Sequence, residues 1–444
     1  MKAESTYVRS YLSEFERLQG ELACASTPWL DELRQRAISD FAGRGLPSTR
    51  DEDWKYTSLS ALGRRGFSLA RPGAAVAAEA TACAEAIAAG GAILFFIDGH
   101  LSTELSRLDG LGEDLIVGSL KSALSDEPEL VRRWLGRALA TDESSFVALN
   151  TAFIEDGAFV YLPEGSELER PLNLVFFSAA GDGARSSQPR NLIVAGEASR
   201  ATITERYLGA ASASMTNSVS ELFLGRDAEI DYLDLQDQDL GACHFHRVEV
   251  EQAEGSSYHS NSLSFGAALA RTEMNVRLSG EGASCRLDGL FMATGSQHLD
   301  NHTVIDHTSP GARSEELYKG VVAGEARGVF TGKVLVRHGS QKTEARQKNN
   351  NLLLSSGAQV DSRPQLEIYN DDVICTHGAT TGQLDREALF YLLSRGLEPA
   401  KAQSLLTRAF IREVLDPIAD ASGREDAEAR TEAWLASFER EVRA

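Results

Sequence analysis

The sequence is poor in cysteine, and it lacks the paired-cysteine motifs of disulfide frameworks and zinc ribbons. Its five cysteines, Cys24, Cys83, Cys243, Cys285 and Cys375, are scattered over 444 residues, and no two of them form a C-x-x-C pair. An odd and dispersed set argues against both kinds of stabilised small fold. We therefore expect a reduced protein.

Long apolar runs and an apolar leader are also missing. The most apolar stretch, AILFFI at 92–97, is far too short to cross a bilayer. The first 18 residues, MKAESTYVRSYLSEFERL, carry acidic residues early and lack the h-region of a secretory signal. We expect a cytoplasmic protein that does not insert into a membrane.

Basic residues are in the minority. The chain has 44 lysines and arginines against 65 aspartates and glutamates, a formal net charge of −21. Such a charge opposes broad contact with a phosphate backbone or an anionic lipid surface. Nucleic acid and membrane are therefore excluded as expected partners, and proteins with basic faces are favoured.

Motifs for nucleotide binding and serine hydrolysis are absent. The segment GVFTGKV at 328–334 lacks the G-x-x-x-x-G-K-[ST] spacing of a phosphate loop, so Lys333 is interpreted as a strand or turn residue. No G-x-S-x-G elbow is present. We expect this chain to bind no nucleotide.

Three regions of the chain differ in their pattern of apolar and polar residues. Residues 1–145 form a helical and mixed region whose first helices are predicted over 8–22 and 28–43. Residues 146–384 consist of short alternating apolar runs separated by glycine and small polar residues. Residues 385–444 return to helical periodicity.

Within the central region, glycine-led turns recur at a nearly constant step. They stand at Gly196, Gly225, Gly255, Gly282, Gly311 and Gly339, with gaps of 29, 30, 27, 29 and 28 residues. A fixed period with two short strands and two turns per unit is typical of a solenoid. A β-sandwich also has frequent turns, but the narrow spread of the gaps favours a parallel β-helix.

The C-terminal region reads as helices that pack against the rest. Asp385 suits an N-cap, and Glu398 followed by Pro399 begins the next helix. One apolar face of that helix is predicted to contain Leu405, Leu406, Ala409, Phe410 and Val414. Packing within the protein is the favoured interpretation, and a partner-binding surface is the alternative.

Two histidine pairs are candidate metal ligands. His244 and His246 share one face of a predicted strand, which would suit a free-standing metal-binding β-protein, and His298 and His302 are four residues apart. Closed sites need three or four convergent ligands, and the sequence nominates no third one for either pair.

A run of carboxylates raises an enzymatic alternative. It contains Asp227, Asp231, Asp234, Asp237 and Asp239. Paired carboxylates on a β-helix are the machinery of a carbohydrate-active enzyme. Such enzymes are usually exported, so solvated turns are the preferred interpretation of this run.

The segment DDVICTHGATTG, residues 371–382, combines cysteine and histidine. Alternation places Cys375 and His377 on one face of an extended segment, where a thiolate and an imidazole could meet a metal such as iron. Two ligands underfill a tetrahedral site. From the residues alone, a structural cysteine beside a histidine that bonds the following turn is favoured.

Longer strings give a more specific indication. RPQLEIYNDDVICTHGATTGQLDREALFYLLSRGL (363–397) and AKAQSLLTRAFIREVL (400–415) closely resemble the C-terminal signature of the SufB/SufD family of iron-sulfur cluster assembly proteins. RDEDWKYTSLSAL (50–62) and FVALNTAFIEDGAFVYLPEG (146–165) resemble the SufD type within it. SufB-type sequences carry further cysteines in and after the core, which this chain lacks.

The resemblance implies a mainly β fold, a right-handed parallel β-helix core flanked by N- and C-terminal helical regions. It implies a non-catalytic scaffold that pairs with SufB through the cores and docks the SufC ATPase on its C-terminal helices. A homodimer is left open for the chain alone, as is a flavin for the assembled complex.

The resemblance also assigns residues. His377 is expected to coordinate a transient iron-sulfur cluster shared with SufB, with Cys375 as a weaker companion. Leu405, Leu406 and Phe410 are candidates for the helical region that meets SufC.

Overall fold

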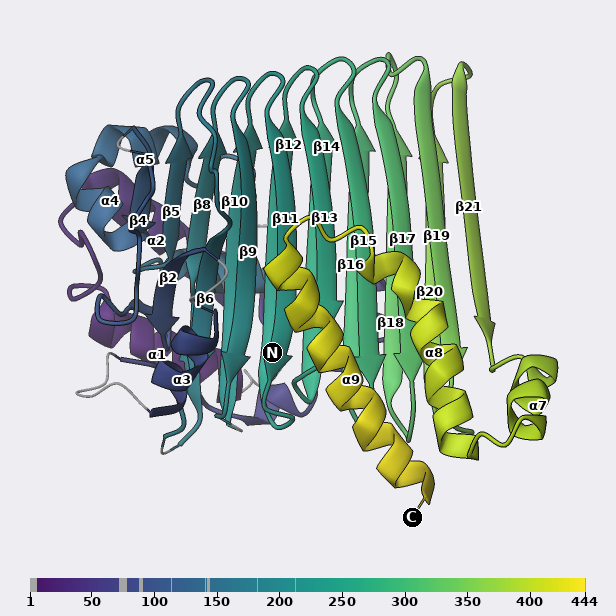
Figure 1. The fold of residues 1–444 in the computed structure, drawn as a ribbon. Helices are drawn as coiled ribbons and strands as arrows, with labels where there is room; N and C mark the ends of the chain where they lie inside the picture. Colours follow the sequence, from purple (N-terminus) through teal and green to yellow (C-terminus); the bar gives the residue numbers. More distant parts are fainter. Residues whose placement is uncertain are drawn as a thin grey trace.

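The centre of the protein is a solenoid of parallel strands (Figure 1). The computed structural model describes residues 6–71, 78–87, 91–112, 114–139, 141, 144–181, 183–211 and 213–443. Successive strands from β8 onward alternate between two sheets, so that each coil contributes one strand to each sheet. The predicted parallel β-helix is confirmed.

One sheet has eleven strands and the other has ten. The eleven-stranded sheet contains β1 (Ser68–Leu69), β4 (Ile116–Ser119), β5 (Ala158–Leu162), β7 (Arg185–Ser187), β8 (Arg190–Ala195), β10 (Ser214–Leu224), β12 (Cys243–Gln252), β14 (Leu269–Leu278), β16 (His298–His307), β18 (Arg327–Val336) and β20 (Gln359–Ile368). The ten-stranded sheet contains β2 (Ala92–Ile97), β3 (His100–Leu101), β6 (Leu172–Ser178), β9 (Arg200–Gly209), β11 (Glu229–Gln238), β13 (Ser257–Ser264), β15 (Ser284–Ala293), β17 (Arg313–Val322), β19 (Thr343–Leu353) and β21 (Val373–Gly382).

The strand register reproduces the glycine period. Arg200 pairs with Glu229, 29 positions later, Glu229 with Ser257, 28 positions later, and Ser257 with Ser284, 27 positions later. Each coil therefore stacks almost directly on the previous one, and equivalent residues form rows along the solenoid axis.

Two kinds of turn explain why glycine recurs. Gly311 has a φ of +68°, which a residue with a Cβ adopts only with strain. Gly225 approaches the coil before it so closely that a Cβ would lie 2.8 Å from the backbone nitrogen of Glu197. Close stacking of coils therefore requires glycine at these corners.

Side chains that point between the sheets form the largest apolar core of the protein. Aliphatic and aromatic residues alternate with outward-facing positions along each strand, as in Val248 and Val250 of β12 or Ile203 and Tyr207 of β9. The core is thus continuous along the axis, because no single coil can bury its apolar face alone.

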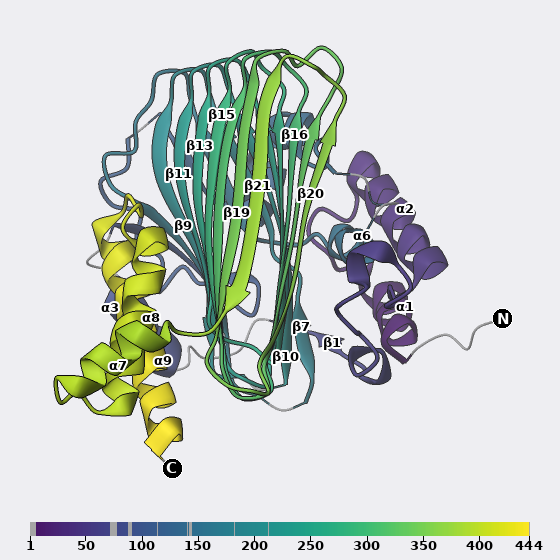
Figure 2. The same cartoon turned by 90° about the vertical axis from the view of Figure 1, so that its right-hand side faces the viewer.

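Helices cover two opposite faces of the solenoid (Figure 2), and the N-terminal part contributes to both, because its helix at Ala78–Ile87 lies on the same side as the C-terminal helices. The N-terminal part contributes α1 (Thr6–Leu18), α2 (Pro28–Arg44), η1 (Glu52–Trp54), η2 (Leu62–Arg64), α3 (Ala78–Ile87), α4 (Leu120–Asp126), α5 (Pro128–Trp134) and α6 (Ser145–Ala152). The C-terminal part contributes α7 (Arg386–Ser394), α8 (Pro399–Leu415) and α9 (Ala421–Arg443). The two predicted N-terminal helices are confirmed, although α1 ends four residues before the predicted boundary.

The segment around Trp54 attaches the N-terminal part to the eleven-stranded sheet. The indole of Trp54 stacks on Phe146 with ring centroids 5.4 Å apart, and the guanidinium of Arg271 lies 3.9 Å from the indole centroid. Arg271 is held in turn by Asp300, whose Oδ2 lies 2.6 Å from its Nη1 and also accepts from Thr57. This segment is therefore an ordered strap held to the sheet by aromatic and ionic contacts.

The C-terminal helices pack on the outer face of the ten-stranded sheet. Ile411 and Val414 of α8, with Trp434 and Phe438 of α9, are buried against residues of β11, β13, β15 and β17 such as Leu263. The predicted caps are confirmed, because Asp385 accepts from the backbone nitrogens at the start of α7 and α8 begins with proline.

Candidate functional site

Both sheets end in strands that have no outer neighbour in the part of the chain that the structure describes. β20 pairs with β18, and β21 pairs with β19 at the far end of the solenoid (Figure 1). Half of the backbone N–H and C=O groups of such edge strands point away from the sheet. This end of the solenoid can therefore accept strands of another chain.

β21 carries Cys375 and His377. Cys375 is half-buried and packs against the cluster of Val334, Val336 and Ala345, so its side chain points into the solenoid. Alternation places His377 on the same side, where it is exposed. The predicted sharing of one face is confirmed, and the exposed member of the pair is the imidazole.

The environment of the two residues favours His377 as a metal ligand. Burial raises the pKa of the Cys375 thiol, which keeps the sulfur protonated at neutral pH. The thiolate is the form that binds metal, whereas a neutral imidazole binds directly. A metal at this position would need further ligands, because a single donor does not close a coordination sphere.

The interior of the last coils is polar. Asn351 Nδ2 donates to Asn349 Oδ1 at 2.6 Å and to Thr381 Oγ1 at 3.4 Å, and Ser362 Oγ donates to Asn349 Oδ1 at 2.7 Å. The equivalent rows of earlier coils also carry buried polar side chains, among them Ser262 and Asp234. A polar mouth suits an end that meets a hydrated or polar surface.

Glu316 is a buried carboxyl one coil below this mouth. Its Oε2 accepts a hydrogen bond from Gln347 Nε2 at 2.6 Å, and its Oε1 has no hydrogen-bond partner among the described residues. Burial raises the pKa of Glu316 to about 7, although the polar side chains of Thr303 and Gln347 oppose the shift. Sequence reasoning missed this residue, because a glutamate within an alternating strand does not reveal which face of the sheet its side chain points to.

Replacing Glu316 with glutamine is expected to stabilise the protein above neutral pH. A carboxyl with a higher pKa in the folded than in the unfolded chain costs no stability below its unfolded pKa, and it destabilises the fold progressively as the pH rises to about 7. Glu316→Gln should therefore raise the free energy of unfolding at pH 8 by about 3 kcal/mol and leave it unchanged at pH 4.

Urea unfolding at both pH values measures the difference. The exposed neighbour Glu315 provides the control, because Glu315→Gln should change neither value. An equal effect of Glu316→Gln at pH 4 and pH 8 would contradict the assignment of the raised pKa to this carboxyl.

His246 lies between two buried carboxylates deeper in the solenoid. Its Nε2 is 3.4 Å from Glu205 Oε2, and its Nδ1 is 3.5 Å from Asp234 Oδ1. Burial opposes the charged imidazole, but Asp234 and Glu205 outweigh it and raise the pKa of His246. Because the carboxylates address opposite ring nitrogens, they do not converge on one point with His244 or with each other.

The second histidine pair is also held by local partners. His298 Nε2 lies 2.8 Å from Thr57 Oγ1, and His302 Nε2 lies 3.0 Å from Asp300 Oδ1. Across the described residues, no group of three or more histidine, cysteine, aspartate and glutamate side chains could hold a metal ion. The free-standing metal-site hypothesis thus has no support from the geometry of either pair.

The interpretation of the aspartate run as solvated turns is wrong for its central members. Asp231, Asp234 and Asp237 lie on β11, where strand alternation sends Asp234 inward and the other two outward. Asp231 contacts His259, and Asp237 contacts Arg430 of α9. The strand could have been predicted from the way these aspartates alternate with Ile230, Tyr232 and the leucines. The high proportion of aspartate in the segment instead suggested a turn.

The predicted apolar face of α8 is partly wrong. The helix buries Thr407, Ile411 and Val414, whereas Leu405 is 42% exposed. Phe410 is half-buried beneath Lys319, whose Nζ lies 4.7 Å from the ring centroid. The buried face is therefore rotated relative to the prediction and combines small residues such as Thr407 with Ile411 and Val414.

α7 exposes several large apolar side chains, and none of them was among the predicted partner-binding residues. Phe390 is 72% exposed, Tyr391 and Leu393 are also exposed, and α7 has no buried residue within the described chain. Exposed aromatic side chains gathered on one short helix are typical of a protein-binding surface. Together with Leu405 on α8, these residues form the apolar surface of the C-terminal helices.

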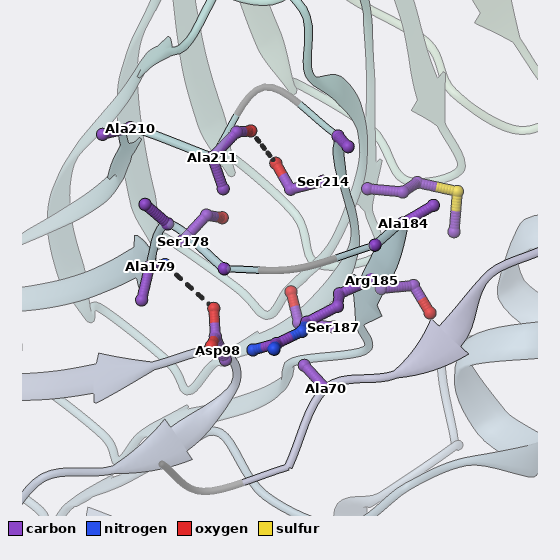
Figure 3. Close-up of a pocket in the computed structure, with 16 residues that line it drawn as sticks. Ala70, Asp98, Ser178, Ala179, Ala184, Arg185, Ser187, Ala210, Ala211 and Ser214 are labelled. Atoms are coloured by element: carbon purple, nitrogen blue, oxygen red, sulfur yellow. Dashed lines mark hydrogen bonds between the residues drawn. The ribbon is translucent and has the colours of Figure 1, made fainter. Parts of the chain in front are cut away.

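A cavity of about 280 Å³ lies near the opposite end of the solenoid (Figure 3). Its walls are mostly alanine, glycine and serine, with Asp98 and Arg185 as the charged members. Asp98 Oδ1 accepts from the backbone nitrogen of Ala179, and Ser214 Oγ donates to the carbonyl of Ala211. These polar groups serve the surrounding loops rather than a common point.

Comparison with known proteins agrees with this architecture. Residues 176–410 match the family model described as "SUF system FeS cluster assembly, SufBD core domain", and residues 2–174 match "SufBD protein N-terminal region". The chain belongs to the SufBD family.

Relatives of the SufBD family cover most of the chain. An iron-sulfur cluster assembly SufBD family protein of Synechocystis sp. is 34% identical over 405 residues, 88% of each chain. The iron-sulfur cluster assembly protein SufD of Escherichia coli is 28% identical over 403 residues, 89% of this chain and 91% of its own. The family resemblance inferred from the sequence is confirmed.

The SufBD core match contains every predicted site residue. Cys375 and His377 on β21, and Leu405, Leu406 and Phe410 on α8, all lie between 176 and 410. None of the helices in the described ranges combines the length and apolar character needed to cross a membrane. The residues nominated from the sequence therefore belong to the core of a family described by its role in SUF iron-sulfur cluster assembly.

Proposed function

We propose that this SufBD protein is a SufD-type scaffold subunit, which pairs with SufB through the open end of its solenoid and contributes His377 to a nascent iron-sulfur cluster. The observation that carries the proposal is the position of His377. It is exposed on the inward-facing side of β21, an edge strand without an outer neighbour among the described residues. A partner strand added there would meet the imidazole.

The cluster is the cargo of this site and is completed by the partner. This chain offers one good nitrogen donor and the half-buried Cys375, whose pKa is raised by burial. SufB would supply the remaining, mostly thiolate, ligands that iron-sulfur clusters require. A neutral imidazole is lost on protonation more readily than a thiolate, which suits a site that releases its product.

The C-terminal helices are proposed to dock SufC, which would bind and hydrolyse ATP in place of this chain. They are fixed to the ten-stranded sheet by ion pairs, among them Lys319 with Glu413 at 2.6 Å and Arg206 with Asp426. Only residues 383–385 separate β21 from α7. Movement of a partner on these helices would therefore be transmitted directly to the strand that carries His377.

We further propose a cytoplasmic, non-catalytic protein, and we assign no nucleotide or flavin to this chain. A carbohydrate-active enzyme would need aligned carboxylates, and the aspartates of β11 point to both faces of the strand. The scaffold proposal accounts for exposed edge strands and exposed aromatic residues, which an independent enzyme does not require.

Co-expression of the tagged chain with its candidate SufB and SufC tests the assembly. We expect all three to co-purify, and we expect Phe390→Asp on α7 to weaken retention of SufC by at least roughly tenfold, because an exposed aromatic that anchors an interface contributes on the order of 2 kcal/mol. Mass analysis of the purified complex measures the retention.

Leu240 supplies the matched control. It is 60% exposed, lies between β11 and β12 and is not part of the apolar cluster that packs the C-terminal helices on the sheet, so Leu240→Asp should leave both partners bound. Recovery of the tagged chain as a monomer or a homodimer, in the presence of soluble SufB and SufC, would contradict the proposal.

A further inference from the structure

Three polar side chains follow one another along a single row of the ten-stranded sheet. Glu316 on β17 is in register with Gln347 on β19, and Gln347 is in register with His377 on β21. Adjacent strands are about 4.8 Å apart, so each side chain lies beside the next. Glu316 and Gln347 are only 4% and 1% exposed, whereas His377 stands at the open end.

The buried part of this row is built as a hydrogen-bonded pair with a free end. Gln347 Nε2 donates to Glu316 Oε2 at 2.6 Å. Gln347 Oε1 is buried and has no hydrogen-bond partner in the described structure. Because the amide nitrogen of Gln347 is bonded to Glu316, its carbonyl oxygen is directed away from Glu316. The next inward-facing residue toward the open end of the solenoid is His377.

Space for the glutamine comes from the opposite sheet. Gly332 on β18 faces Gln347, and a Cβ at that glycine would lie 2.3 Å from Gln347 Nε2. On the inner side, the row continues with Leu287, which offers no hydrogen-bonding group to Glu316. Further hydrogen bonds along the row are therefore possible toward His377 but not toward Leu287.

We propose that Gln347 and Glu316 are positioning residues that determine which ring nitrogen of His377 carries its proton. This inference rests on the proposed function, in which the other nitrogen binds the cluster. Gln347 Oε1 is unpaired in the structure, and in this proposal it would accept the N–H of the inward ring nitrogen. Such a bond leaves the outward nitrogen as a free lone pair. It also satisfies a buried acceptor that is costly to leave unpaired.

Protonation of Glu316 reverses the arrangement. The carboxylic O–H then donates to Gln347 Oε1, and the amide turns its NH₂ group toward His377. The inward nitrogen has to accept, so the ring proton moves to the outward nitrogen and blocks it. One proton is taken up from solvent by Glu316, and no electrons are transferred.

The surroundings of Glu316 allow both forms near neutral pH. Its titratable neighbours are Cys285 and Tyr318, whose charged forms it disfavours, and Thr303 faces it from the eleven-stranded sheet. No cation contributes to its environment within the described residues, and burial raises the pKa of the carboxyl to about 7. Readiness of His377 to bind metal should therefore increase as the pH rises through about 7.

Nuclear magnetic resonance of the full chain, labelled with ¹⁵N-histidine, tests the positioning directly. His377 signals are identified by their loss in His377→Ala, and the proportions of the two neutral tautomers are followed from pH 6 to 9. We expect the proportions to change across pH 7 in the wild type, to be independent of pH in Glu316→Gln, and to match those of a free histidine in Gln347→Met. Glu315→Gln, one residue away on the outer face, should behave as wild type.

Iron and sulfide loading of the complete complex, at pH 6.5 and 8.5, is the second measurement. We expect loading to rise with pH at least threefold more in the wild type than in Glu316→Gln, in which only the titration of the ligands themselves remains. Identical tautomer proportions and loading in Glu316→Gln and Glu315→Gln would overturn the inference. Normal loading of His377→Ala would instead overturn the proposed function, while the tautomer measurement would still decide the positioning.

Discussion

Replacing His377 with alanine is expected to lower the iron and sulfide content of the reconstituted complex by roughly tenfold or more. Loss of an outer-shell partner of a metal ligand already lowers affinity on the order of 10- to 100-fold, and His377 is proposed as a ligand itself. The side chain is exposed at the end of the solenoid and packs into no apolar cluster, so its removal should not affect folding. Anaerobic reconstitution followed by iron and acid-labile sulfide analysis gives the result.

Two comparisons make this experiment specific. His338 is an exposed histidine on a turn of the same solenoid, and His338→Ala should load normally. Cys375→Ser should have a smaller effect than His377→Ala, because burial keeps the Cys375 thiol protonated. If His377→Ala loaded as well as His338→Ala, the cluster would have to be held without this residue.

Replacing Glu221 with alanine is expected to destabilise the protein by about 3–5 kcal/mol, since it leaves a buried arginine without its counter-ion. Arg190 and Glu221 form an ion pair of 2.6 Å in which both side chains are 0% exposed. Glu221 Oε1 also accepts from the backbone nitrogen of Gly136, and Arg190 Nη1 donates to Asn150 and Thr151 of α6. The pair therefore links the N-terminal helices to β8 and β10.

An exposed pair with the same chemistry is the control. Arg200 and Glu229 are 2.9 Å apart on neighbouring strands, and both are more than half exposed. Glu229→Ala should cost no more than about 1 kcal/mol, because water and salt screen the interaction. Guanidinium-induced unfolding, followed by near-ultraviolet circular dichroism, measures both variants. Equal costs would show that Arg190 finds another partner when Glu221 is removed.

Local chemistry made several features predictable from the sequence. The glycine period follows from turns that need a positive φ or leave no room for a Cβ, as at Gly311 and Gly225, and these requirements recur once in every coil. The cap at Asp385 and the helix start at Pro399 are also decided by residues within one turn of helix. Each of these signals acts over a few residues, so no partner element has to be known.

Features that depend on a distant partner were predicted poorly. The orientation of α8 is decided by how closely small residues such as Thr407 approach the sheet, and the predicted leucine face pointed elsewhere. The buried cluster of His246, Glu205 and Asp234 brings together three strands whose spacing along the chain carries no motif. Asp231, Asp234 and Asp237 look like turn residues until the register of β11 is known.

The repeating coil, the helical ends, the family, and the placement of a cysteine and a histidine on one side of a strand followed from the amino-acid pattern. That Cys375 is half-buried while His377 is exposed, and that Glu316 and Gln347 lie behind it, became apparent from the packing of the coils. The reason is that a parallel solenoid aligns residues about 30 positions apart into rows, as in Glu316 to Gln347 to His377, 31 and then 30 positions. Side-chain contacts across a row depend on register, which is set by the stacking of whole coils rather than by any local pattern.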